Sequence, residues 1–193
     1  MTQSPTRFTA LQRLLHWLMA IAILAMLFIG VGMVSTIRPS HLILVSIHKP
    51  LGIAILVLAL LRLGLRLRDG APALPAALPE PVKLAAHLSH VAFYLLMICM
   101  PLIGWAMMSA AAYPIVLFGG VHLPAILPLN ARLHALLWDA HYYLAFALFA
   151  LILLHVAAAL HHALVRRDGV FQAMAPLPTG GPMANPVSAP HPR

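Results

Sequence analysis

Four long apolar runs constrain this chain more than any other feature. They cover residues 14–35, 42–65, 88–110 and about 135–164 of the 193-residue sequence. Each run is long enough to cross a hydrocarbon core about 30 Å thick as a helix. A helix also satisfies every backbone N–H and C=O group within the segment, which lipid requires. The sequence therefore predicts an all-α fold, an integral membrane four-helix bundle.

The composition agrees with lipid as the main solvent. Hydrophobic residues make up 62% of the chain and charged residues only 8%, against about 25% charged residues in an ordinary soluble domain. The formal net charge of +8 comes from basic residues at the ends of the apolar runs. Because no basic stripe lies between aromatic residues, we exclude nucleic acid as a partner. The single cysteine, Cys99, excludes an intrachain disulfide and a multi-cysteine metal centre.

The distribution of Lys and Arg predicts the orientation in the membrane. Nine of the twelve fall on the side that holds both termini, and three fall on the other side. By the positive-inside rule, both termini are cytoplasmic. Residues 1–172 then form the transmembrane domain, and the Pro-rich residues 173–193 form a disordered cytoplasmic tail. The apolar connection at 111–133 is expected to dip into the periplasmic interface.

The histidines carry the functional signal. The chain has twelve, and an ionisable side chain at membrane depth indicates a function by default. His141 and His155 lie on one face of the fourth run, about 10 Å on either side of its centre. His16 enters the first helix at the depth of His155, and His48 enters the second at the depth of His141. The topology therefore predicts the pairs His16–His155 and His48–His141.

Paired histidines at these depths indicate haem rather than zinc. Zinc usually takes four N, S or O ligands, and no Cys, Asp or Glu is at hand to complete such a set. A haem needs only axial ligands from the protein, because the porphyrin supplies four nitrogens. Two histidines per iron leave no open position for a substrate, which suits electron transfer. We therefore expect two b-type haems, one in each leaflet.

Other polar residues near these depths have more than one interpretation. Lys49, Arg62 and Arg66 could pair with haem propionates, or they could only mark the membrane boundary. His87 and His90 share one face of the third helix. They could lie at the interface, line a quinone pocket or handle protons, or replace His16 as a ligand.

Four blocks of the sequence resemble the bacterial cytochrome b561 family, which is related to the cytochrome b subunits of nickel hydrogenases. The blocks are RLLHWLMAIAIL, IHKPLGIAILVLALLRLGLRL, HLSHVAFYLLMICMPLIGWAMMS and HYYLAFALFALILLHVAAALHHALVRRDGVFQAM. The resemblance implies a four-helix bundle in the inner membrane with two bis-histidine b haems and quinone, such as ubiquinone, as a redox partner. The family's ligand positions match His16, His48, His141 and His155, and its third-helix pattern matches His87 and His90.

The function expected from these features is electron transfer between a periplasmic donor and the quinone pool by a transmembrane di-haem cytochrome. The resemblance makes superoxide one candidate donor. One alternative is a cytochrome b anchor subunit of a separate dehydrogenase or hydrogenase. Another is a haem-free bundle that transports protons or metal. The donor stays open, as does a homo-oligomer.

Overall fold

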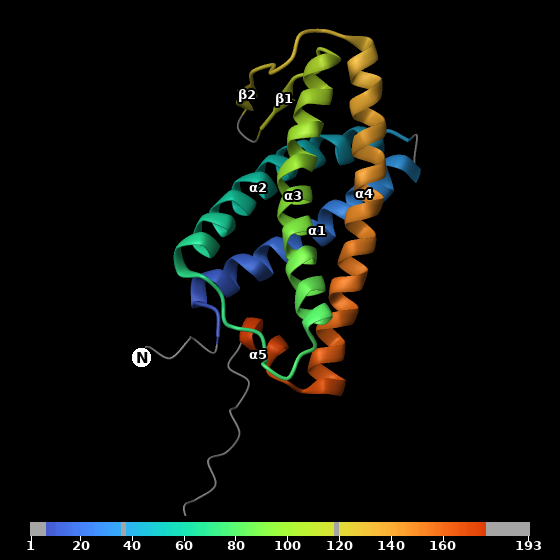
Figure 1. Ribbon diagram of the computed structural model, residues 1–193. Helices are drawn as coiled ribbons and strands as arrows, with labels where there is room; N and C mark the ends of the chain where they lie inside the picture. Colours follow the sequence, from blue (N-terminus) through green and yellow to red (C-terminus); the bar gives the residue numbers. More distant parts are fainter. Residues whose placement is uncertain (1–6, 36–37, 118–119, 177–193) are drawn as a thin grey trace, which may run out of the picture.

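The protein is an all-α bundle of four long helices (Figure 1). The computed structural model describes residues 7–35, 38–117 and 120–176. The helices are α1 (Ala10–Ser35), α2 (Ser40–Asp69), α3 (Glu80–Ala110) and α4 (Ala131–Leu160). All four are long and apolar enough to cross a membrane. The predicted integral membrane four-helix fold is confirmed, and the exposed apolar side chains of these helices contact lipid.

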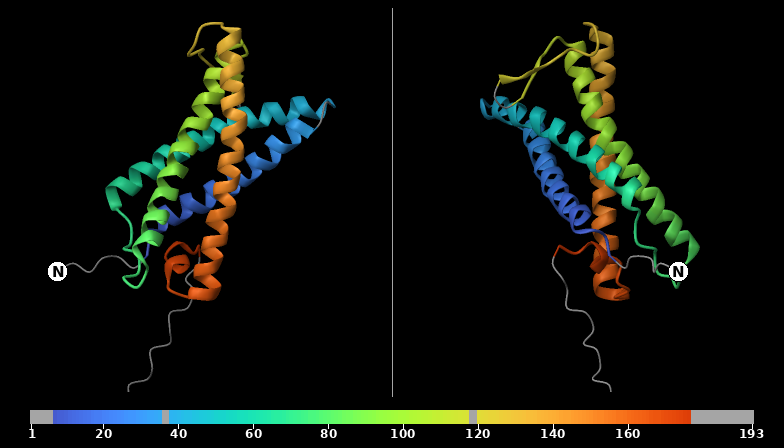
Figure 2. Two further views of the ribbon diagram at one scale, coloured as in Figure 1. Left: turned by 45° about the vertical axis from the view of Figure 1, so that its right-hand side comes forward. Right: turned by 90° about the vertical axis from the view of Figure 1, so that its left-hand side faces the viewer.

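The helices form two antiparallel pairs. Helix α1 packs along α2, α3 packs along α4, and α2 also contacts α3. The α1–α2 pair is steeply inclined to the α3–α4 pair (Figure 2). A small core of Met19, Ala59 and Met97 joins α1, α2 and α3. In Figure 1 the end where α1 begins and α4 ends lies below, and we call it the lower end; the opposite end is the upper end.

The start of α1 is held by a buried glutamine. Thr9 and Gln12 exchange two hydrogen bonds, of 3.1 and 3.2 Å, between side chain and backbone N–H, which is the capping-box arrangement. The Gln12 Nε2 atom also donates to the carbonyls of Leu65 and Gly70. Gln12 is 3% exposed, so one satisfied polar side chain ties the start of α1 to the end of α2.

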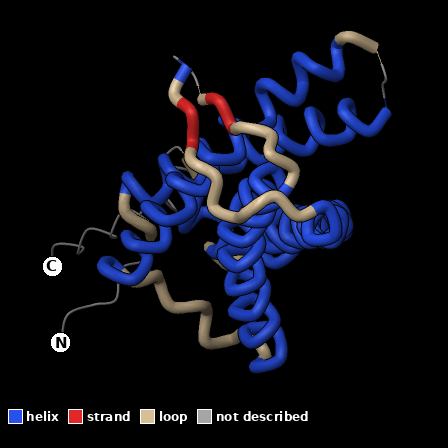
Figure 3. The backbone as a smooth tube through the Cα atoms, turned by 90° about the horizontal axis from the view of Figure 1, so that it is seen from above, coloured by secondary structure: helices blue, strands red, loops and turns tan. Residues whose placement is uncertain are grey.

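The connection from α3 to α4 is a short β-hairpin at the upper end. Strands β1 (Ile115–Val116) and β2 (His122–Leu123) pair in antiparallel register. The Trp105 Nε1 atom donates to the Pro124 carbonyl at 2.9 Å, and Lys49 Nζ donates to the Pro114 carbonyl at 3.4 Å. The hairpin therefore lies against the upper parts of α2 and α3. Figure 3 shows its two strands side by side, seen from above. The sequence predicted a connection here but not the strand pairing.

At the lower end the chain turns back under the bundle. Helix α4 continues into one π-helical segment, η2 (His161–Arg166), and a short helix α5 (Val170–Met174) follows. The reversal uses left-handed backbone at Arg167 (φ 50°) and Gly169 (φ 85°). The predicted start of the tail at residue 173 falls within α5, and residues 177–193 of that tail lie outside the described residues.

Candidate cofactor site

The structure brings both predicted histidine pairs together. His48 on α2 and His141 on α4 have ring centroids 6.2 Å apart, with planes inclined by 66°. His16 on α1 and His155 on α4 have ring centroids 6.3 Å apart, with planes inclined by 64°. One pair lies towards the upper end and the other towards the lower end. Helix α4 supplies one histidine to each, as its heptad spacing predicted.

This ring spacing fits one metal ion between each pair. A metal ion lies about 2.0 Å from an imidazole nitrogen, and that nitrogen lies about 1.15 Å from the ring centre, so two rings that share one ion have centroids about 6.3 Å apart. Both pairs match this spacing to within about 0.1 Å. Two facing imidazoles are the axial ligand set that a haem iron needs.

The ring nitrogens of these residues are poorly satisfied by the protein. The Nδ1 atoms of His16, His48 and His141 are buried without a hydrogen-bond partner among the described residues. The ring of His141 approaches the Met100 backbone but outside hydrogen-bond geometry. Buried polar atoms with no partner are rare, so a structural hydrogen bond does not explain these positions. His134 is different, because its Nδ1 atom lies 3.0 Å from the Met107 carbonyl.

Neighbouring residues pack close to the rings. A Cβ atom added at Gly104 would lie 3.4 Å from Cε1 of His141, so glycine lets α3 pass close to that ring. Phe93 contacts His155 edge to face, with centroids 5.1 Å apart. Across the described part of the chain, no group of three or more His, Cys, Asp or Glu could hold a metal ion. These donors therefore fit haem, which brings its own in-plane ligands, better than zinc.

A third histidine, His90, lies beside the lower pair, and we call His16, His90 and His155 the lower cluster. His90 lies with its ring centroid 6.1 Å from that of His155, so distance alone does not separate it from His16. Exposure does, because His90 is exposed whereas His16 is half-buried like His48, His141 and His155. His87, also exposed, lies one helical turn before His90. The sequence indicated that either residue could replace His16 as a ligand. The nearly equal distances of His16 and His90 from His155 could not be predicted without the tilts of the helices.

The three cationic candidates already have protein contacts. Arg62 lies over the ring of Tyr94 at 6.0 Å and close enough to His16 and His155 to interact electrostatically. Arg66 lies over the ring of Phe8 at 5.5 Å. Lys49 donates to the hairpin. A role towards haem propionates stays a prediction for all three.

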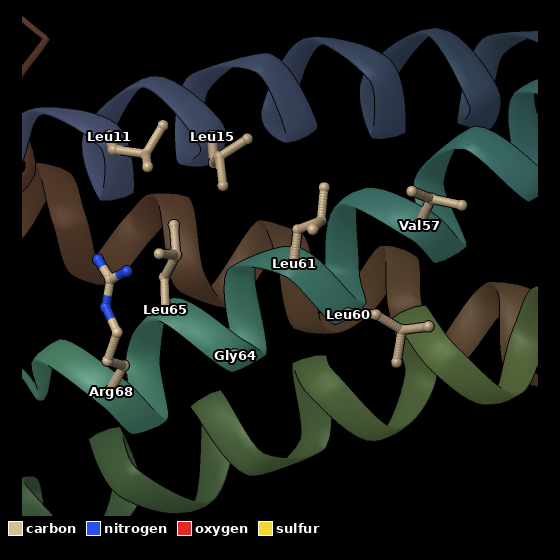
Figure 4. A pocket seen from close by; sticks show the side chains of 8 residues that line it. All are labelled: Leu11, Leu15, Val57, Leu60, Leu61, Gly64, Leu65 and Arg68. Carbon is tan, nitrogen blue, oxygen red and sulfur yellow. The ribbon is translucent and has the colours of Figure 1, made fainter.

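One hollow lies away from the histidines. It is a groove of about 590 Å³ between α1 and α2, with Arg68 at one end (Figure 4). Its lining is otherwise apolar and carries no histidine, and Arg68 forms an ion pair with Asp69 at 2.6 Å. We assign this groove to the lipid-facing surface. A smaller hollow of about 270 Å³ lies under the hairpin beside Trp105 and Tyr113.

Comparison with known proteins identifies the family of the chain. The model of the family described as prokaryotic cytochrome b561 matches residues 7–176. The chain belongs to the prokaryotic cytochrome b561 family.

Its relatives cover most of its length. Cytochrome b561 homolog 2 of Escherichia coli K12 is 28% identical over 176 residues, which is 90% of this chain and 93% of that protein. The probable superoxide oxidase CybB of Yersinia pestis is 36% identical over 135 residues, 69% of this chain and 76% of that protein. As a cytochrome b561, the chain is a multi-pass inner-membrane protein with an electron-transfer role, and its family implies haem b.

Proposed function

We propose that this cytochrome b561 holds two b haems and passes electrons across the membrane from a periplasmic donor to quinone. His16 and His155 hold the lower haem, and His48 and His141 hold the upper one. The observation that carries the proposal is the ring spacing of 6.3 and 6.2 Å in two separate pairs. A haem held by two imidazoles would have no position left for a substrate, so it would supply one-electron transfer alone.

The two pairs supply an electron path between the faces of the bilayer. His141 and His155 are fourteen residues apart on one helix, which is about 21 Å along its axis. A flat macrocycle at each pair would shorten the gap between the redox groups. Most Lys and Arg residues of the chain lie at the lower end, and this bias supports a cytoplasmic lower end with both termini inside.

The lower cluster is where we place quinone. Reduction of a quinone to quinol takes two electrons and two protons. His90 is exposed and adjacent to His155, so it could hydrogen-bond a quinone oxygen next to the lower haem, and His87 lies on the same helix face. Arg62 keeps this cluster electropositive, which favours a developing quinone anion.

Superoxide is our candidate donor at the upper end. The name of the Yersinia pestis relative, probable superoxide oxidase, suggests this chemistry. Two superoxide anions would each lose one electron and leave as dioxygen. The two electrons, with two protons, would convert one quinone to quinol, so the reaction balances.

The test is quinone reduction by the purified chain in vesicles that contain ubiquinone. We expect superoxide generated outside the vesicles to reduce the haems and then the quinone. The His87→Ala/His90→Ala double variant should keep haem reduction but reduce quinone at least tenfold more slowly. Unchanged quinone reduction in that variant would remove the quinone assignment. Haem reduced by a copurifying protein, and not by superoxide, would favour the anchor-subunit alternative.

A further inference from the structure

The segment that follows α4 returns to the start of α1 below the lower histidine pair. We call residues 167–175 the C-terminal latch. It contains α5 and ends at Ala175, which is 2% exposed although it lies close to the end of the described chain. A segment that only led into a tail would not be expected to bury its last residue.

One end of the latch is fixed to η2 by Asp168. Its Oδ2 atom lies 2.8 Å from Nδ1 of His162 and accepts from Nε of Arg166 at 3.1 Å. Its Oδ1 atom accepts from the backbone N–H of Val170 at 3.3 Å. Asp168 thus connects η2 to the first turn of α5. The π-helical segment and the left-handed Arg167 and Gly169 set the direction of the reversal.

The other end of the latch is fixed to α1. Three successive carbonyls accept hydrogen bonds from the first part of the chain: Ala173 from Phe8 N at 3.2 Å, Met174 from Trp17 Nε1 at 3.0 Å, and Ala175 from Arg7 Nη2 at 3.4 Å. Trp17 adjoins His16 in the sequence, and their rings meet edge to face at 5.6 Å.

Helix packing supports the lower pair less than the upper pair, because α2, which carries His48, also packs against α3, whereas α1, which carries His16, packs mainly along α2. His16 lies on α1, which packs along α2, whereas His155 lies on α4, which packs along α3. The latch contacts α4 and η2 and is hydrogen-bonded to α1. The upper pair lies at the far end of α4 and has no contact with it.

We propose that the C-terminal latch positions His16 opposite His155 and thereby sets how tightly the lower haem alone is held. The proposal rests on the two-haem assignment above. Trp17 is the positioning residue, since its indole N–H joins the latch to the helix turn that carries His16. Haem-release rate and reduction potential of the lower site should respond to the latch, and those of the upper site should not.

The test uses the full-length chain with the substitution Trp17→Phe, which keeps an aromatic ring and removes the N–H donor. We expect the lower haem to pass to a haem-scavenging globin roughly fivefold faster, the factor for one net hydrogen bond of about 1 kcal/mol. The potential of the lower haem should shift while that of the upper haem stays fixed. Hydrogen exchange at residues 170–175 should also be faster in haem-free Trp17→Phe than in the haem-free wild-type chain.

The matched control is Trp105→Phe. Trp105 donates its own indole N–H to a loop carbonyl, that of Pro124 at 2.9 Å, but at the upper end. This variant should leave the lower haem unchanged. The proposal is overturned if Trp17→Phe alters neither haem, or if it loosens both haems equally, as general destabilisation would. A wild-type chain without a lower haem would instead refute the two-haem assignment.

Discussion

At the scale of single residues, either His16 or His90 of the lower cluster could be the haem ligand opposite His155. Both rings lie within 6.3 Å of the His155 ring. The half-buried His16 has an unsatisfied buried Nδ1 atom, whereas His90 is exposed. We therefore expect His16→Ala to lose the lower haem and His90→Ala to keep it. Haem per chain in the two variants measures the difference, and the reverse result would move the ligand to His90.

Gly104 makes a residue-scale prediction for the upper pair. A Cβ atom added at Gly104 would lie 3.4 Å from the His141 ring. The larger leucine side chain of Gly104→Leu would therefore displace that imidazole. We expect this variant to lose the upper haem and keep the lower one in an optical spectrum. Gly64→Leu is the control, because a Cβ there meets nothing within 4 Å. Two haems in Gly104→Leu would contradict the placement.

At the scale of elements, the hydrogen bonds of Asp168 predict how the C-terminal latch responds to pH. Burial alone would raise the pKa of Asp168, but the hydrogen bonds from His162, Val170 N–H and Arg166 outweigh it and hold the pKa below the ordinary 3.8. A lowered carboxyl pKa contributes stability above the unfolded-state pKa, and this stability is lost as the pH falls through the folded-state value.

The latch should accordingly stay docked from about pH 8 to about pH 5 and release only below pH 3.8. Asp168→Asn removes the charge, so it should weaken docking at neutral pH and abolish the acid-dependent step. Hydrogen exchange at residues 170–175 reports both effects. Glu80→Gln is the control, since Glu80 is 84% exposed in its ion pair with Lys83 and lies on α3. An acid-dependent step that survives in Asp168→Asn would refute this role.

The junction of α1 and α2 gives a stability prediction. Gln12→Ala removes three side-chain hydrogen bonds: one from Thr9 N–H, one to the Leu65 carbonyl in α2, and one to the carbonyl of Gly70, which directly follows α2. We expect the free energy of unfolding to fall by about 2 kcal/mol, measured as thermal unfolding in detergent. Ser46→Ala breaks an exposed hydrogen bond to Ile43 and should change stability by less than about 0.5 kcal/mol. Equal losses of stability in Gln12→Ala and Ser46→Ala would show that Gln12 does not hold α1 and α2 together.

The elements also show where sequence reasoning stops. The four helices were predictable because each is an apolar run longer than a bilayer is thick, although α3 begins at Glu80 rather than Leu88. The position of His141 and His155 on one face of α4 followed from helical periodicity. The hairpin, η2 and α5 were missed. The hairpin and α5 are held by hydrogen bonds to distant residues, such as Lys49 to Pro114 and Trp17 to Met174, that leave no local pattern. The proximity of His90 to His155 depends on helix tilt.

At the scale of the whole molecule, two inclined helix pairs meet at two histidine contacts, one towards each membrane face. Helix α4 takes part in both contacts, and α1 and α2 supply one partner each. The histidines thus join helix pairs that otherwise meet mainly through α2 and α3. A cofactor at each contact would stabilise the bundle as well as conduct electrons, because a ligand that binds only the folded state favours it.

The most direct measurement is a reduced-minus-oxidised optical spectrum of the purified chain, with haem counted per polypeptide, repeated for His155→Ala and His141→Ala. We expect b-type bands from two haems in the wild type and from one in each variant, and the haem that remains should have a different reduction potential in the two variants. One haem in the wild type, or two haems in either variant, would refute the assignment of one haem to each histidine pair.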